Sequence, residues 1–406
     1  MQLALIADAF PPMKTSGAVQ IRDLVAELEK QGHLITVLLP DSSLKSQWEL
    51  DEEGGLKVLR LKAPETKDAN YFRRFIGEYL LSFFMCRNLQ NSPLKNKKWD
   101  GIIWYSPSIF FGRLVKKLKV ESRCPAYLIL RDIFPEWAVD TGLLNNGLVY
   151  QYFKKVERFQ YQQADVIGVQ THSNLQYFSE HQPGLDAEIE VLNNWLADTK
   201  SGGCSINLND TALAGRKFFA YTGNIGIAQA MDILIDLANE FKEDSSVGFI
   251  FVGRGTAVEQ IKKRAVEYNL NNILFFDEIS PEEIPGLLSQ CRIGLIALDP
   301  RHRNDNIPGK FLAYMQAGLP VLANINAGND LKVLVDEYQV GKVEENNLLS
   351  SLTEMARNVV ANLELDNAIQ QRCQDLSRAK FSPASAVSQI ISSLESASPS
   401  SSESAR

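Results

Sequence analysis

The chain has 406 residues, more than one ordinary hydrophobic core accommodates, and this length predicts two domains. Hydrophobic residues make up 45% and charged residues 22%, as in globular proteins, and the formal net charge of -7 gives no basic footprint for a nucleic-acid partner. The five cysteines are scattered and never form a Cys-x-x-Cys pair, which disfavours a disulfide framework and a zinc site and favours a cytoplasmic protein.

The first residues, Met1 to Asp8, have no basic leader and reach an acid after a short apolar run. They predict a buried strand rather than a signal peptide. No uninterrupted run of about 18 apolar residues occurs, so we expect no transmembrane helix.

The first half of the chain alternates short apolar runs with segments of helical period. A strand at 3–7, a helix around 21–28 and a strand at 35–39 form a βαβ pattern. Further buried strands are expected at 102–105, 126–130, 166–169 and 189–192. Such alternation predicts a parallel sheet covered by helices on both faces, in a domain spanning residues 1–197.

A polar stretch at 198–215 is expected to link this domain to a second one at 216–380. The second domain repeats the pattern, with strands expected at 218–221, 247–252, 273–276, 293–298, 320–323 and 340–343. A last helix, 381–396, is expected to pack back on the first domain, and the Ser-rich tail 397–406 to be disordered. The fold class is therefore α/β, with two doubly wound Rossmann-like domains facing a cleft.

Two glycine-containing turns follow strands of the second domain. In Tyr221–Gln229, the residues Gly223, Asn224 and Gly226 precede a helix whose free N–H groups attract phosphate. The alternative is a plain strand-to-helix turn that uses glycine for a positive φ.

The second turn, Val252–Gly255, places Arg254 where it faces either a phosphate or only solvent. Gly253 and Gly255 are not followed by the third glycine of a G-x-G-x-x-G fingerprint, because that position is Val258. The turn therefore argues against an NAD-dependent oxidoreductase.

Lys310 stands in the first turn of a helix expected to begin at Pro308 and Gly309. A cation there opposes the helix dipole, which a bound diphosphate explains better than local stability does. The alternative is a solvated lysine that bends away from the helix end.

In the first domain, Leu130–Glu136 ends a buried strand with the adjacent pair Arg131 and Asp132. Asp132 either orients an acceptor hydroxyl or positions Arg131, and the alternative is a structural ion pair that caps the next helix. Gly17, at the turn before the first helix, either lets a ligand approach the backbone closely or only relaxes the loop.

The four histidines form no metal pair, and neither a D-x-D motif nor a His/carboxylate cluster is present, so we expect no metal. The aromatic segment Tyr71–Arg87 has basic residues at both ends. It is either a membrane-interface helix or a core-facing helix of the first domain.

Taken in order from Leu3 to about Ser396, these segments resemble glycosyltransferase family 4, which has the GT-B fold. They are most similar to bacterial aminosugar transferases of O-antigen and capsule assembly, such as the L-fucosamine transferases. The motifs that carry the resemblance are Arg131–Glu136, the turn Gly223–Gln229 and the helix start Pro308–Lys310.

The resemblance implies a metal-independent, retaining hexosyltransferase that needs no cofactor. Its donor would be a UDP-sugar held by the second domain. Its acceptor would be a saccharide linked to polyprenyl diphosphate, used in surface polysaccharide synthesis at the cytoplasmic face of the inner membrane. The catalytic residues expected are Arg131, Asp132 and Lys310. The donor-binding residues expected are Gly17, Gly223, Asn224, Gly226, Gln229, Gly253, Arg254, Ile279, Asp305, Pro308, Gly309 and Lys310.

Several positions depart from the wider family. Asn224 and Gln229 replace its usual Arg and Lys, so the diphosphate charge would fall more heavily on Lys310. Asp305 and Ala313 stand where the family has two glutamates, and Arg131 stands where others have a histidine. The alternatives are a UDP-N-acetylglucosamine epimerase on the same fold and a non-catalytic sugar-binding protein.

Overall fold

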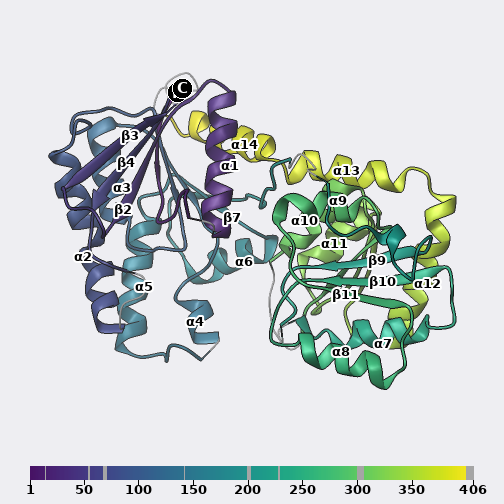
Figure 1. Cartoon of the computed structure of the whole chain (residues 1–406). Coiled ribbons are helices and arrows are strands. Elements are labelled where there is room, and N and C mark those ends of the chain that lie inside the picture. The colour runs from purple at the N-terminus through teal and green to yellow at the C-terminus, as the bar shows by residue number, and fades with distance from the viewer. Residues whose placement is uncertain are drawn as a thin grey trace, which may run out of the picture. The chain divides into compact units, whose positions relative to one another are not determined.

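The structure is a computed structural model that divides into two compact units, each of them α/β (Figure 1). It describes residues 1–13, 15–53, 55–66, 71–140, 142–198, 203–226, 229–299 and 306–398. The first unit contains Met1–Asn193 and the residues from Pro383 onward, and the second contains Asn194–Ser382. Residues 399–406 of the expected tail lie outside the described residues.

The first unit is built on an eight-stranded sheet of order β3-β4-β2-β1-β5-β6-β7-β8. Its strands are β1 Gln2–Ile6, β2 Leu34–Asp41, β3 Trp48–Glu53, β4 Leu56–Lys62, β5 Gly101–Tyr105, β6 Ala126–Ile129, β7 Val166–Val169 and β8 Glu188–Val191. All neighbouring pairs are parallel except β3 with β4. This antiparallel edge is not predicted from the sequence, because β3 alternates its apolar residues with acids and gives no continuous apolar run.

Helices cover this sheet and bury their apolar faces in its core. They are α1 Ser16–Lys30, α2 Tyr71–Gln90, α3 Gly112–Ser122, α4 Glu136–Asp140, α5 Leu148–Tyr161, α6 His172–His181 and α14 Pro383–Ser396. Helix α1 begins where the Thr15 hydroxyl accepts a hydrogen bond from the Ala18 N–H, at a distance of 3.3 Å. Although it is last in the sequence, α14 lies beside α1 in this first unit (Figure 1).

The second unit has a six-stranded, wholly parallel sheet of order β11-β10-β9-β12-β13-β14. Its strands are β9 Lys217–Thr222, β10 Val247–Val252, β11 Ile273–Phe276, β12 Ile293–Ala297, β13 Val321–Asn324 and β14 Gly341–Glu344. Its helices are α7 Asp232–Glu240, α8 Val258–Glu267, α9 Ile284–Leu288, α10 Gly309–Ala317, α11 Asp330–Tyr338, α12 Leu349–Leu365 and α13 Ile369–Lys380. Together the two sheets confirm the prediction of two doubly wound domains.

The segment expected to link the domains is partly core. Ile206, Leu208 and Leu213 are buried in the second unit. The Gln290 side chain holds this segment, since its amide accepts a hydrogen bond from the Leu208 N–H at 2.8 Å and donates to the Ile206 carbonyl at 2.9 Å. Three separated apolar residues in a polar stretch leave no periodic signal, which explains why the sequence indicated a plain linker.

Helix α2 presents two different faces. Leu81 and Met85 are buried in the core of the first unit, which confirms the core-facing interpretation for that side. On the opposite side Phe75, Tyr79 and Phe83 have exposed fractions of 37%, 49% and 51%. Among the described residues, no helix combines the length and the apolar character needed to cross a membrane.

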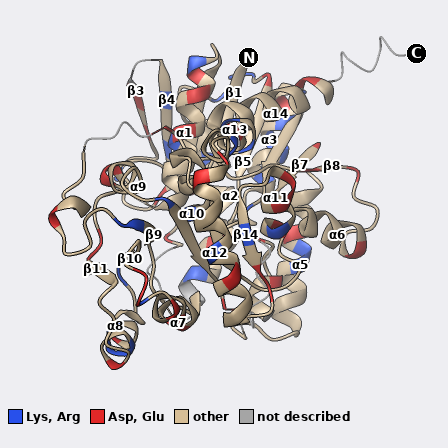
Figure 2. Cartoon of the chain, turned by 90° about the vertical axis from the view of Figure 1, so that its right-hand side faces the viewer, with Lys and Arg blue, Asp and Glu red and all other residues tan. Residues whose placement is uncertain are grey.

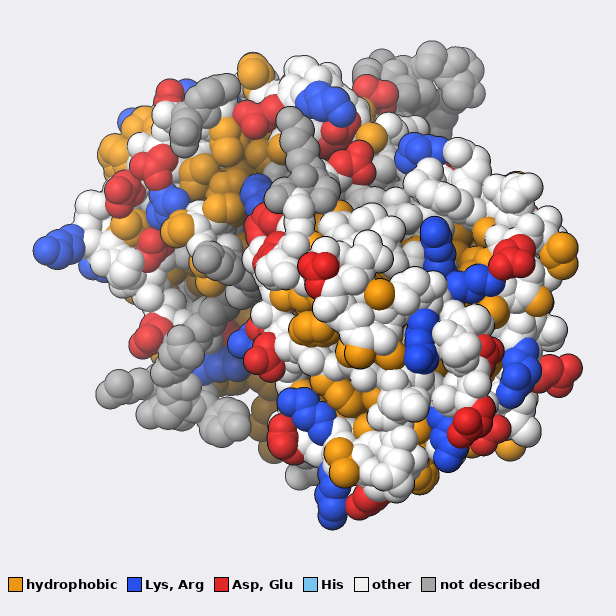
Figure 3. Space-filling view, turned by 45° about the vertical axis from the view of Figure 1, so that its right-hand side comes forward, with side chains coloured by type: hydrophobic (Ala, Val, Ile, Leu, Met, Phe, Trp, Pro, Cys, Tyr) orange, Lys and Arg blue, Asp and Glu red, His pale blue; other side chains and the backbone are white. Residues whose placement is uncertain are grey.

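Charges of both signs are spread over the molecule. Helix α8 carries acids and bases in turn, with Lys262 and Lys263 beside Glu259 and Glu267 (Figure 2). The face drawn in Figure 3 shows Lys, Arg, Asp and Glu side chains interspersed among its described residues. This mixture lacks the single-sign stripe typical of a nucleic-acid surface.

In each sheet, successive strands are added first on one side of a central strand and then on its other side. In the first unit β1 pairs with both β2 and β5, and in the second unit β9 pairs with both β10 and β12. Ligands of open parallel sheets bind at the carboxyl ends of the strands beside such a switch point. The two switch points therefore mark where each unit is expected to hold a ligand.

Candidate functional site

The two glycine turns of the second unit are interlocked. The Gly223 N–H donates to the Val252 carbonyl and the Ile225 N–H to the Arg254 carbonyl, each at 2.9 Å. Gly253 has a φ of 154°, and a Cβ placed on it would lie 1.9 Å from the Gly223 carbonyl oxygen. Only glycine fits this position, so the two turns form one close-packed backbone layer at the carboxyl ends of β9 and β10.

The polar side chains of these turns contact each other. The Gln229 side-chain oxygen Oε1 accepts hydrogen bonds from the Gly226 N–H at 2.9 Å and from the Asn224 side-chain amide at 3.0 Å. Arg254 is 82% exposed and forms an ion pair with Glu278 at 2.9 Å. Asn224 and Gln229 therefore brace the turn, and Arg254 extends into solvent beside it.

Lys310 lies at the start of α10, the helix that follows β12. Pro308 is its N-cap residue, with φ -61° and ψ 135°, so Lys310 is the second helical residue. Its Nζ donates to the Tyr221 hydroxyl at 3.1 Å and lies 4.4 Å from the centre of that ring. Tyr221 belongs to β9, so the lysine and the tyrosine meet at the switch point between β9 and β12.

The surroundings of the Lys310 ammonium disfavour its charged form. Burial lowers its pKa to about 8. Within the described parts of the chain, no carboxylate forms a salt bridge with it. A half-buried cation at a helix N-terminus, held by a tyrosine hydroxyl, is suited to bind an anion.

Tyr314, one turn after Lys310 on the same helix, fixes the position of α10. Its buried hydroxyl lies 3.0 Å from the Ala220 carbonyl and 3.1 Å from the Leu295 carbonyl, and thus joins β9 to β12. A Cβ on Gly294 would lie 2.3 Å from the Tyr314 ring. The glycine inside an otherwise apolar strand is the sequence signal that indicates this contact.

Ile279 follows β11 and packs, half-buried, against the core. Ala313 is likewise partly buried against the core. Asp305 lies outside the described residues.

The sequence predicts Gly17 in a turn before the first helix. The structure places it inside the first turn of α1 instead. The helix begins earlier because Thr15 caps it. A Cβ on Gly17 would lie 3.5 Å from the ring of Tyr105, whose hydroxyl donates to the Gln20 side chain at 2.7 Å. Tyr105 is the last residue of β5, so this contact lies at the switch point of the first sheet. Tyr105 is not among the site residues predicted from the sequence.

Arg131 and Asp132 follow β6 and differ in exposure. Arg131 is buried, donates to the Leu192 carbonyl at 3.1 Å, and has its guanidinium 6.0 Å from the centre of the Tyr105 ring. The Asp132 side chain is exposed. Arg131 therefore fixes the strand end by contacts inside the unit, and Asp132 is the group that a ligand can reach.

Glu136 begins α4, close after this strand end. Lys154 of α5 forms an ion pair with it at 2.8 Å, and the Tyr150 hydroxyl donates to it at 3.1 Å. These contacts attach the 131–136 segment to α5. Among the described residues, no three His, Cys, Asp or Glu side chains gather closely enough to hold a metal ion.

Comparison with protein families places a match in the second unit. Residues 208–375 match the family described as Glycosyl transferases group 1. The chain is 24% identical over 224 residues to "Probable glycosyltransferase WbjE" of Pseudomonas aeruginosa, a match that covers 53% of this chain and spans only 54% of that protein. It is 23% identical over 367 residues to "Putative colanic acid biosynthesis glycosyl transferase WcaI" of Escherichia coli K12, covering 83% of this chain and 86% of that protein.

A solved structure shares the whole fold. Anabaena HepE, crystallised in complex with UDP and glucose, superposes with a TM-score of 0.62 at 14% sequence identity. The superposition covers 97% of this chain and 99% of that one. At this identity the likeness concerns the fold, which is the GT-B arrangement of two Rossmann-like units.

Proposed function

We propose that the chain is a retaining glycosyltransferase that uses a UDP-sugar, on the basis of the match between residues 208–375 and the family described as Glycosyl transferases group 1. It transfers a hexose or an N-acetyl aminosugar to a lipid-linked saccharide during surface polysaccharide synthesis. The name of WcaI, which refers to colanic acid, and the UDP and glucose bound to HepE support this choice. The motifs at 131–136, 223–229 and 308–310 favour family 4 and its aminosugar subgroup.

Lys310 carries the proposal. When the sugar C1–O bond of the donor breaks, negative charge develops on the departing diphosphate. The Lys310 ammonium and the N-terminal N–H groups of α10 are fixed beforehand at the switch point, where they stabilise that charge without a metal. Tyr221 holds the ammonium in place, and Tyr314 holds the helix.

The first unit supplies the acceptor side in this proposal. Asp132 is exposed at the carboxyl end of β6 and orients the acceptor hydroxyl. Arg131 acts as a positioning residue through its contacts with Leu192 and Tyr105. Retention then depends on the donor and acceptor being held in one geometry.

The affinity for UDP is expected to fall as the pH rises above about 8. The free Lys310 has a pKa of about 8, and a bound diphosphate raises it, so the protonated form binds more tightly. The affinity for UDP is therefore highest well below pH 8 and declines by up to about tenfold per pH unit above it. Calorimetric titration with UDP at pH 7 and pH 9 measures this decline.

Lys310→Arg keeps its charge at both pH values and is expected to lose most of the pH dependence. An unchanged UDP affinity between pH 7 and pH 9 in the original chain would count against Lys310 as the diphosphate ligand. A screen of UDP-sugars with a polyprenyl-diphosphate saccharide acceptor tests the transfer itself.

We also propose that the exposed face of α2 rests on an anionic membrane surface. Phe75, Tyr79 and Phe83 supply apolar rings on this face. Helix α3 packs against α2 and adds the exposed cations Arg113 and Lys116, with the Arg113 guanidinium 5.8 Å from the centre of the Tyr79 ring. Aromatic rings beside basic groups are typical of helices that lie in a lipid interface.

The double variant Tyr79→Ser, Phe83→Ser is expected to lower binding to phosphatidylglycerol-containing liposomes by about tenfold, because two apolar rings no longer leave water. Co-sedimentation measures the bound fraction. Val266→Ser in α8 is the matched control, since Val266 is 74% exposed but lies in the second unit. Equal sedimentation of the double variant and the original chain would refute this membrane face.

A further inference from the structure

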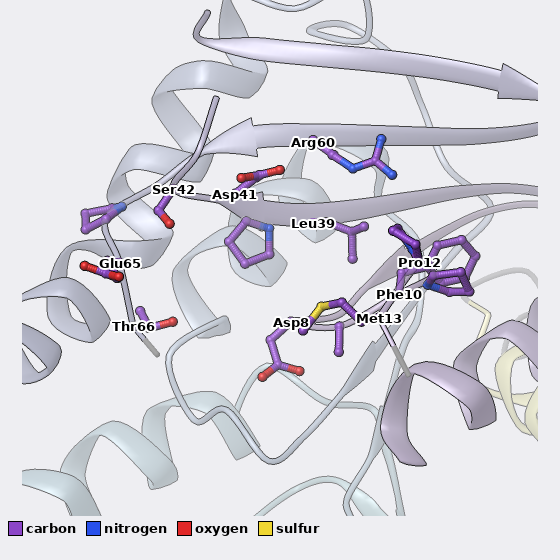
Figure 4. A pocket seen from close by; sticks show the side chains of 14 residues that line it. Asp8, Phe10, Pro12, Met13, Leu39, Asp41, Ser42, Arg60, Glu65 and Thr66 are labelled. Carbon is purple, nitrogen blue, oxygen red and sulfur yellow. The ribbon is translucent and has the colours of Figure 1, made fainter. Parts of the chain in front are cut away.

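The first unit contains a pocket on the far side of β1 from the Gly17 and Tyr105 contact. Its volume is about 360 Å³, and the loops that follow β1, β2 and β4 line it (Figure 4). Since β4, β2 and β1 are neighbours in that order, these loops meet at one edge of the sheet. A volume of this size suits a small ligand of about one ring.

The lining of the pocket is divided between apolar and polar groups. Phe10 and Pro12 lie at one end, and Glu65 and Thr66 lie at the other (Figure 4). Met13, which is 41% exposed, adds a further apolar surface between them. A sugar ring has the matching character, because its C–H faces are apolar and its hydroxyl groups are hydrogen-bond donors.

The charges that line the pocket disfavour an anionic ligand. Glu65 is exposed, and Asp41 is occupied by local hydrogen bonds from the N–H and hydroxyl of Ser43. Arg60 is the cation of the lining, and its guanidinium forms an ion pair with Asp51. Carboxylates accept hydrogen bonds from hydroxyl and amide N–H groups but repel carboxylate and phosphate groups.

We propose that this pocket binds a neutral sugar ring of the acceptor, at a unit beyond the one that receives the transferred sugar. The inference rests on the proposed transferase function. Residues 8–13, which follow β1, line the pocket, and β1 is also the strand at the switch point of the sheet. Phe10, Pro12 and Met13 contact the ring face, and Glu65 and Thr66 accept hydrogen bonds from its hydroxyl groups.

Saturation-transfer NMR on the full chain tests this site without requiring turnover. The probes are methyl N-acetyl-β-glucosaminide, which is neutral, and glucuronate, which is anionic. We expect saturation transfer to the neutral glycoside and none to glucuronate. Glu65→Gln and Met13→Ser are each expected to weaken the neutral glycoside's binding about fivefold, the effect of one hydrogen bond or one apolar contact.

The matched controls are Glu188→Gln and Val120→Ser, which change an exposed acid of β8 and an exposed valine of α3 in the same unit. They are expected to leave the signal unchanged. A glucuronate signal as strong as that of the glycoside, or a glycoside signal that survives both pocket variants, overturns the pocket assignment. If the pocket variants do abolish glycoside binding but the chain transfers sugar from no UDP-sugar, the proposed function fails and the binding site stands.

Discussion

Lys310→Met is expected to lower the turnover of sugar transfer by about 10² to 10³-fold, the usual loss when a fixed charge-stabilising group is removed. Methionine keeps the length and the apolar stem of the side chain but not the charge. The same variant is expected to unfold at an equal or higher temperature, because the half-buried position of Lys310 disfavours its charged form. Activity and stability should therefore change in opposite directions.

Transfer kinetics and thermal unfolding, measured on the same preparation, check both parts of this prediction. Lys342→Met is the control, since Lys342 is an exposed lysine on β14 of the same unit. It is expected to keep normal turnover. If Lys310→Met transfers sugar at the original rate, the diphosphate is neutralised elsewhere, and if it unfolds much earlier, Lys310 has a structural role.

Gly253→Ala is expected to destabilise the second unit by about 3 kcal/mol or more, through overpacking and backbone strain together. Its Cβ would lie 1.9 Å from the Gly223 carbonyl oxygen, which is backbone and cannot move aside as a flexible side chain does. The φ of 154° is also a conformation that alanine rarely adopts. Separation of the two glycine turns should weaken UDP binding as well.

Chemical denaturation followed by a probe in the second unit measures the loss. Gly309→Ala is the matched control for stability, because nothing lies within 4 Å of its Cβ and the residue is helical. It is expected to be neutral or slightly stabilising. Equal stability of the two variants would show that the interlocked turns separate easily, contrary to the packing described above.

The glycine turns show where local sequence information ends. Both turns are recognisable from a strand, a glycine and a helix in succession, since these signals lie within about ten residues of each other. The hydrogen bonds that join them are between residues about 30 apart, such as Ile225 and Arg254. These hydrogen bonds depend on β9 and β10 being neighbours in the sheet, and no local sequence pattern predicts which strands are neighbours.

The first unit shows the same limit at Gly17 and Arg131. The sequence predicts Gly17 in a turn before the first helix and Arg131 at the end of a buried strand, yet Gly17 lies inside α1 against Tyr105, and Arg131 turns inward to Leu192. The pocket lined by Phe10, Asp41 and Glu65 is composed from three loops and had no sequence signature. Asp132, in contrast to Gly17 and Arg131, has the exposed side chain that the sequence-based prediction requires.

The α/β class, the two repeated series of strands and the helix start that carries Lys310 follow from the sequence, because apolar periodicity and proline geometry act over a few residues. The tertiary structure decided what Lys310 meets. Tyr221 is 89 residues earlier in the chain, and Tyr314 joins β9 to β12 only because those strands are neighbours at the switch point. The order of strands in a sheet arises from pairing between distant segments, so the surroundings of the half-buried Lys310 ammonium depend on the fold.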